Sequence, residues 1–161
     1  MRKLILISMF AVIALGVDAQ HVFEKGSIMF NAGTGLPHSN GFVPTINFSG
    51  EVGAIPTGTV GLVSFGGLTE FQFADNGIDI YPKFYIGGRA AWHLHAFQSD
   101  EFDAYGGVGF GISIAGKGYG SIPEPDVFVG GRWMFSPGMG LFAELGYTGL
   151  SSAKFGISFG L

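Results

Sequence analysis

Strict alternation of apolar and polar side chains is the feature that most constrains how this chain folds. Residues 83–97 read KFYIGGRAAWHLHAF, and every second residue from Phe84 to Ala96 is apolar or small. The positions between them carry both charges and both histidines of the segment. Successive side chains of a β-strand point to opposite faces. This stretch is therefore predicted to be a strand with one apolar and one polar face.

The same alternation recurs along the chain and predicts about eight strands, most of them ~9–12 residues long. Besides 83–97 they lie near 27–35, 43–54, 103–114, 126–136, 139–148 and 152–161, with a less regular strand at 58–66. Among the links, 67–82 and 115–125 are long, whereas 55–57, 98–102 and 136–138 are short and rich in turn residues. Strand length and alternating link length are typical of an up-and-down membrane barrel.

Composition narrows the class of protein. Charged residues make up only 12% of the chain, against roughly 25% in an average soluble domain. The net charge is −4 and no basic run follows residue 3, which argues against a nucleic-acid partner. The absence of cysteine removes disulfides and cysteine–zinc sites. The 29 glycines and 17 phenylalanines favour close-packed strands and turns over long helices.

The N-terminus has the layout of a secretory signal peptide. A short basic stretch, Met1 to Lys3, precedes an apolar run from Leu4 to Leu15, and a small residue, Ala19, ends the segment. A membrane-anchoring helix is the alternative, but the run is shorter than the ~20 residues that a span needs. We expect residues 1–19 to be a cleaved signal peptide and residues 20–161 to form one exported barrel domain.

Two kinds of barrel fit these strands. A soluble lipocalin-like barrel would place Phe84, Trp92, Phe110 and Trp133 inside, around a greasy ligand. Its water-facing surface would then have very few charges. A membrane barrel places the same residues against lipid, and its closed sheet satisfies every backbone hydrogen bond in the bilayer. We therefore predict an all-β, eight-stranded antiparallel transmembrane barrel.

The polar face then points into a lumen that, with eight strands, is just wide enough to be filled by side chains. The alternation of side chains along the strands places a polar network there, made of Glu51, Tyr85, Arg89, Arg132, Glu144 and Lys154. Buried charges are costly unless they are paired, and each arginine fork suits a carboxylate. We expect Arg132 to pair with Glu144 across the tight 136–138 turn, and Arg89 to pair with Glu51 beside Tyr85. Such a network would plug the barrel.

The two lumen histidines, His93 and His95, share one strand face. This spacing suits a metal if Glu51 or Glu144 supplies a third ligand. The simpler interpretation is a pair of hydrogen-bonded or wet histidines near the short turn at 98–102. His21 and His38 lie at strand ends, so no Ser-His-Asp arrangement is indicated. We predict no metal, no cofactor and no enzymatic activity.

Several phrases in the second half of the chain resemble a known family. They are residues 84–95, residues 103–111, the pair Val-Gly-Gly-Arg-Trp-Met-Phe (129–135) and Gly-Leu-Phe-Ala-Glu-Leu-Gly-Tyr (140–147), and the end of the chain from Phe155. Together they resemble the small outer-membrane β-barrel of Bacteroidetes, of the OmpA and OmpX type. The resemblance implies the outer membrane of a Gram-negative bacterium, contact with its lipid, and a final strand (Phe155, Ile157, Phe159, Leu161) read by the barrel-assembly machinery.

The family has no single activity, so three functions remain open. The first is a structural or interaction barrel that displays loops 67–82 and 115–125 to other outer-membrane proteins or serves as an accessory subunit. The second is a narrow pore for ions or small solutes. The third and weakest is a soluble ligand-binding barrel.

Overall fold

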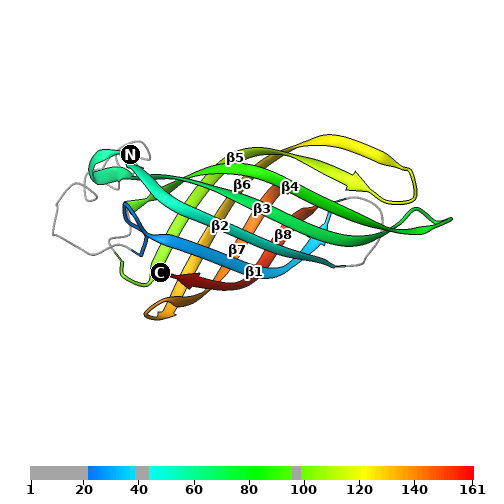
Figure 1. The fold of residues 1–161 in the computed structure, drawn as a ribbon. Coiled ribbons are helices and arrows are strands. Elements are labelled where there is room, and N and C mark those ends of the chain that lie inside the picture. Colours follow the sequence, from blue (N-terminus) through cyan, green and yellow to red (C-terminus); the bar gives the residue numbers. More distant parts are fainter. Residues whose placement is uncertain (1–21, 39–43, 96–98) are drawn as a thin grey trace, which may run out of the picture.

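The strands predicted from alternation close into one barrel (Figure 1). The computed structural model describes residues 22–38, 44–95 and 99–161. Within them each strand pairs antiparallel with its neighbours in sequence, and β8 pairs with β1. The strands are β1 (Ile28–Pro37), β2 (Thr45–Pro56), β3 (Gly61–Asp75), β4 (Ile80–Leu94), β5 (Phe102–Ala115), β6 (Gly120–Ser136), β7 (Met139–Thr148) and β8 (Ser151–Gly160). The predicted eight-stranded up-and-down barrel is confirmed.

The predicted signal peptide, residues 1–19, lies outside the described residues. Among the residues that are described, no helix is long and apolar enough to cross a membrane.

The barrel has two different ends. β1 begins and β8 ends at the same one, where the backbones of Ile28 and Leu161 bond to each other. We call it the termini end. At this end β2 ends and β3 begins, β4 ends and β5 begins, and β6 turns into β7. The opposite end, here the hairpin end, carries the β3–β4 and β5–β6 hairpins, which reach farthest from the termini (Figure 1).

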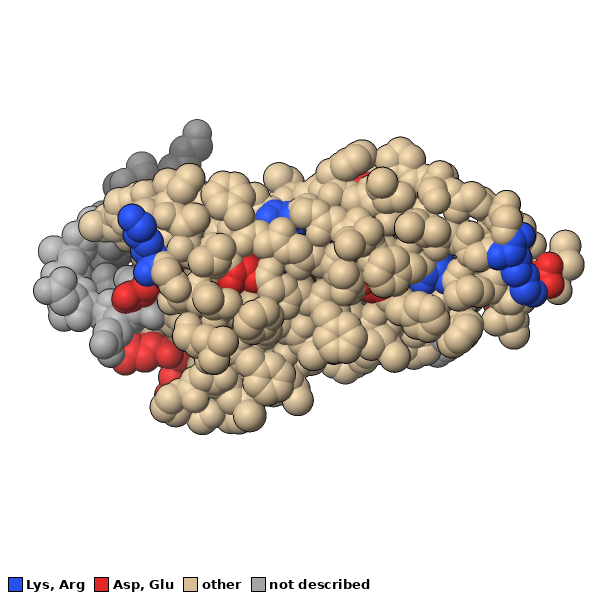
Figure 2. Space-filling view, in the orientation of Figure 1, with Lys and Arg blue, Asp and Glu red and all other residues tan. Residues whose placement is uncertain are grey.

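The polar face of each strand points inward and the apolar face outward. On β4, Tyr85 and His93 are fully buried, while their neighbours Ile86 and Trp92 are 52% and 42% exposed. The same holds around the barrel, where Phe110 is 62% exposed on the outer wall. Figure 2 shows charged atoms gathered at the two ends, with only small charged areas on the wide surface between them. The distribution is the reverse of that in a soluble barrel with an apolar interior.

Lumen glycines make room for large side chains on the neighbouring strand. The ring of Tyr105 lies over Gly130, directly opposite on β6, and a Cβ at Gly130 would meet that ring at 2.7 Å. Phe128 covers Gly107 of β5 in the same way, with a Cβ at Gly107 meeting the ring at 2.5 Å. These pairs explain why glycines alternate along the inward face.

The strands are strongly tilted against the barrel axis. The stagger is seen by stepping around the barrel from each residue to its direct partner on the next strand. A path that starts at Thr45 of β2 and passes through all the other strands returns to β2 at Pro56. Closing a sheet into a barrel requires such a stagger. As a consequence, inward residues that are close in the lumen are not the ones equally far from a turn.

The prediction of two long loops is wrong. The predicted loop 67–82 is mostly strand, because β3 runs to Asp75 and β4 starts at Ile80. Likewise β5 and β6 are linked by residues 116–119 only, in place of the predicted loop 115–125. The irregular strand predicted at 58–66 begins only at Gly61, after the short 3₁₀ helix η1 (Gly58–Val60).

The physical reason for the missed strand in β6 lies in its prolines. Pro123 and Pro125 suggest a loop because proline cannot donate to a ladder. Both are paired with β5, but the ladder between β6 and β7 ends at Val127. The prolines therefore sit on a free strand edge, where the missing N–H costs no hydrogen bond.

Candidate functional site

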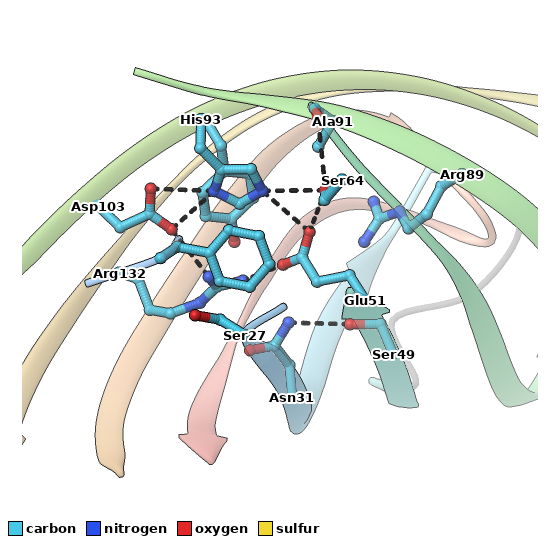
Figure 3. Close-up of polar contacts among 12 residues, drawn as sticks. Ser27, Asn31, Ser49, Glu51, Ser64, Arg89, Ala91, His93, Asp103 and Arg132 are labelled. Carbon is cyan, nitrogen blue, oxygen red and sulfur yellow. Dashed lines mark hydrogen bonds and ion pairs between the residues drawn. The ribbon is translucent and has the colours of Figure 1, made fainter. Parts of the chain in front are cut away.

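A closed ring of four charged side chains fills the termini end of the lumen (Figure 3). Arg132 of β6 donates through Nη1 to Asp103 Oδ2 (2.8 Å) and through Nη2 to Glu51 Oε1. His93 of β4 completes the ring, with Nδ1 2.9 Å from Asp103 Oδ2 and Nε2 3.0 Å from Glu51 Oε2. Cations and carboxylates thus alternate around the ring.

The charge state of the ring follows from its geometry. Both nitrogens of His93 face carboxylate oxygens, so the doubly protonated imidazolium donates to both. Two cations then balance two carboxylates, which is what a buried cluster needs. Ser64 of β3 supports the arrangement, because its hydroxyl donates to Glu51 Oε2 at 2.6 Å.

Aromatic rings cover this cluster on two sides. Phe23 stacks on His93 with 4.2 Å between ring centroids, and Tyr105 lies 5.2 Å from the same imidazole. The guanidinium carbon of Arg132 is 4.7 Å from the Tyr105 centroid. The rings keep water from the charges, and the interactions between those charges are stronger in a drier environment.

A second cluster lies farther along β4 toward the hairpin end. Arg89 donates to both carboxylate oxygens of Glu144 at 3.1 Å and through Nε to Asp126 Oδ2 at 3.1 Å. Its guanidinium lies 3.6 Å from the centroid of Phe128. Tyr105 also donates to Glu144, at 3.2 Å, and its contact with Arg132 joins this cluster to the first.

A third cluster surrounds the buried carboxylate of Glu70. It accepts hydrogen bonds from the Leu150 amide and the Thr45 hydroxyl, each at 2.7 Å, and from the Ser151 hydroxyl. Lys154 Nζ lies 3.5 Å from it. Nearer the hairpin end, Glu124 accepts from Tyr147 at 2.7 Å and lies 3.8 Å from Lys83. Ionic groups therefore occupy the lumen along much of its length.

All six residues predicted for the lumen network lie inside the barrel. Tyr85, Arg89, Arg132, Glu144 and Lys154 are each at most 8% exposed, and the Glu51 side chain is 10% exposed.

The predicted ion pairs, however, are wrong. Arg132 bonds Glu51 and Asp103, and Arg89 bonds Glu144 and Asp126. Arg132 lies opposite Phe142 on β7, while Glu144 lies opposite Gly130, one inward position farther from the turn. Asp103, directly opposite Arg132 on β5, takes the place expected for Glu144.

The expected role of Tyr85 as a hydrogen-bonding neighbour is also wrong. Its hydroxyl has no hydrogen-bond partner among the described residues. The side chain instead packs with Leu68 and Leu150, in a space that Gly87 and Gly111 leave open.

The two histidines have separate surroundings. His93 is held by two carboxylates, whereas Nε2 of the half-buried His95 lies 3.2 Å from the Phe23 carbonyl oxygen. No group of three or more His, Cys, Asp or Glu side chains in the described segments is arranged to hold a metal ion. In the last strand, Phe155, Ile157 and Phe159 face outward and are 40–55% exposed, and Leu161 follows the strand.

Sequence reasoning missed several residues of the network, among them Phe23, Glu70, Asp103, Glu124 and Asp126. Parity alone places Asp103 with Tyr105, and Asp126 with Phe128, on the inward face. Glu70 and Glu124 were hidden because their segments looked like loops. Phe23 carries no such signal, because it precedes the first strand.

A comparison with protein-family models and a search of curated proteins both find no match for this chain.

Proposed function

We propose that this chain is an integral outer-membrane barrel of a Gram-negative bacterium whose lumen is closed by its own side chains. It acts as a structural or interaction protein, not as an enzyme or open channel. One observation carries the proposal. The barrel is apolar outside, and inside it holds paired charges that run from the Glu51–Arg132 ring to Glu124.

The outer wall favours lipid over water as its surroundings. Val108, Phe110, Val129 and Leu145 are each 60–62% exposed, and together they would form a large apolar patch on a soluble protein. Trp92, Phe102 and Trp133 lie near the termini end of this wall, and Phe73 and Phe84 lie toward its hairpin end. Aromatic residues at both borders of an apolar band are typical of outer-membrane barrels.

The lumen argues against a soluble lipocalin-like carrier and against a wide pore. A carrier of apolar ligands needs an apolar cavity, whereas this interior holds Arg89, Arg132 and Lys154 bonded to carboxylates. The same ion pairs occupy the space through which solute would pass. We therefore place the chain among small OmpA- or OmpX-like barrels on the sequence resemblance and the strand number.

In this orientation the termini end faces the periplasm and the hairpins face outward, as in other bacterial barrels. The outward side chains of the last strand, from Phe155 to Phe159, would be read by the barrel-assembly machinery during insertion. The surface offered to other outer-membrane proteins is then the pair of hairpin tips, in place of the loops first expected. Ile78, at the tip between β3 and β4, is 90% exposed.

Planar-bilayer recording tests the closed lumen. The unmodified barrel should conduct poorly, and Glu144→Ala should raise its conductance or open it intermittently, because Arg89 loses its two-pronged partner. The matched control is Glu101→Ala, an exposed carboxylate outside the lumen. A steady, large conductance of the unmodified protein that Glu144→Ala leaves unchanged would contradict the proposal and favour the pore.

Crosslinking in native membranes tests the interaction role. A photoreactive residue at Ile78 should capture a membrane-embedded protein more efficiently than one at Val60, which lies at the termini end and is 53% exposed. If both variants capture the membrane-embedded protein to the same extent, so that equal amounts of barrel stay uncrosslinked, partner binding by the hairpins is contradicted.

A further inference from the structure

The segment that precedes β1, Val22–Ser27, turns into the mouth of the barrel at the termini end. Its Phe23 is only 1% exposed and packs with Met29, Leu62 and Met134. Val22 packs against the same group. An aromatic side chain from outside the barrel sheet therefore closes the lumen at this end.

Phe23 contacts the charge ring directly. Its ring stacks on His93 at 4.2 Å, and the guanidinium carbon of Arg132 lies 5.8 Å from its centroid. Its carbonyl oxygen lies 3.2 Å from Nε2 of His95. An aromatic residue in the mouth thus has three contacts: its ring stacks on an imidazole and lies near a guanidinium, and its backbone has one polar contact.

The barrel wall does not need this segment. The first and last strands close through Ile28 and Leu161, after the segment has ended. Gly26 donates to Gly53 at 2.9 Å, and Gly53 donates back to Ser27 at 2.9 Å. A Cβ at Gly53 would meet the Glu24 carbonyl oxygen at 2.2 Å, so glycine at this position admits the segment.

Open space adjoins the segment at the mouth of the barrel. A recess of about 630 Å³ is lined by Val22, Glu24, Met29 and Met134, among others. The segment is therefore bordered by free space and is not enclosed on every side by strands.

We propose that the mouth at the termini end is a binding site for a short aromatic peptide, and that its resident ligand is the chain's own segment Val22–Ser27, with Phe23 as the inserted side chain. Departure of the segment exposes the ring of Glu51, His93, Asp103 and Arg132 to solvent. The site depends on the barrel and its lumen, and stands whether or not the protein conducts or binds a partner.

Thiol labelling of the purified barrel tests the site. The chain has no cysteine, so Ser64→Cys places a single thiol beside His93, where Ser64 is 1% exposed. In this background, Phe23→Ala should raise the labelling rate by a water-soluble thiol reagent about tenfold or more, because burial of a phenylalanine shifts an opening equilibrium by at least that factor. Phe102→Ala is the matched control, since Phe102 begins β5 at the same end but is 54% exposed on the outer wall and does not line the recess.

Two further measurements separate binding from a folding defect. Gly53→Ala, which leaves Phe23 intact, should speed labelling in the same direction by displacing the segment. In a variant that lacks residues 22–26, an added peptide of sequence Val22–Ser27 should slow labelling again, and the same peptide with Phe23→Ala should not. Equal labelling with and without Phe23, or no effect of the peptide, would overturn the site.

Discussion

At the scale of single residues, partner geometry decides where charges are tolerated in this barrel. Arg132 is 2% exposed, and each of its two terminal nitrogens bonds a different carboxylate. Taking one partner away leaves an uncompensated buried charge, which is far more costly than removing both partners. The network should therefore respond to substitutions in pairs.

A double-mutant cycle tests the assignment of partners. Arg132→Met and Glu51→Gln share one ion pair, so their effects on the free energy of unfolding should be non-additive by about 0.5–3 kcal/mol. Arg132 and Glu144 are not bonded to each other. The effects of Arg132→Met and Glu144→Gln on the free energy of unfolding should therefore be closer to additive. The measurement is urea unfolding of the refolded barrel in lipid vesicles. Stronger coupling of Arg132 to Glu144 than to Glu51 would restore the pairing across the turn and refute the ring.

At the scale of strands, glycine and aromatic residues on neighbouring strands fit together. Gly130 and Gly131 are adjacent on β6 but face opposite sides. A Cβ at Gly130 would meet the Tyr105 ring at 2.7 Å, whereas one at Gly131 would lie 3.8 Å from its nearest neighbour, the Asp103 carbonyl oxygen. The two positions offer a matched comparison within one strand.

Gly130→Ala should destabilise the barrel by about 1–3 kcal/mol, because overpacking displaces Tyr105 from the charge ring. Gly131→Ala should change the free energy of unfolding by less than half of that. Both variants can be compared by urea unfolding in the same vesicles. Equal effects at the two positions would contradict the close fit of Tyr105 over Gly130, and a larger effect of Gly131→Ala would mean that the inward and outward faces of β6 are exchanged.

The two hairpin tips are joined by an exposed contact that should depend on pH. Lys117 donates to Asp79 at 2.9 Å, and this hydrogen bond holds the pKa of the carboxyl below its ordinary value of 3.8. A lowered pKa means that the contact contributes above pH 3.8 and is lost as the pH falls through the folded pKa. Amide hydrogen exchange at residues 76–79 should therefore become faster relative to the barrel amides below pH 3.8. Lys117→Met should weaken this pH dependence, and its undiminished persistence would contradict the contact.

The strand pattern could be predicted from the sequence because the polarity of each side chain indicates whether it lies on the inward or the outward face of the sheet. The bounds of β7 agree with the prediction, and most other strands differ by only a few residues. The pattern failed where polar residues occupy the inward face close to a strand end, as at Glu70 and Glu124. Ion pairing could not be predicted, because it depends on the stagger around the whole barrel. Nor could the position of Phe23, which no strand periodicity fixes.

At the scale of the whole molecule, the barrel is inverted relative to a soluble protein. Its outer wall is a band of apolar side chains, and its interior carries most of the charges found between the two ends. The apolar outer wall and the paired charges inside are two consequences of the same alternation. The same alternation also predicts which substitutions the barrel tolerates.

Arginine on the outer wall should be costly at mid-height and cheap at the hairpin tip. Phe110→Arg and Ile157→Arg should each lower the free energy of unfolding in lipid vesicles by about 2–4 kcal/mol if these residues lie at the bilayer midplane. Ile78→Arg, at a tip position that is 90% exposed, should cost about 0–1 kcal/mol. Small and equal effects at all three sites would show that the wall does not contact lipid.

The most direct test of the central claim is the fractionation of cells that produce this protein. Outer membranes are isolated and washed with alkaline carbonate, which releases soluble and peripheral proteins but leaves integral ones in the pellet. The apolar wall predicts that the barrel stays in the outer-membrane pellet. Recovery of the folded barrel in the soluble fraction would contradict membrane insertion and favour the soluble ligand-binding barrel.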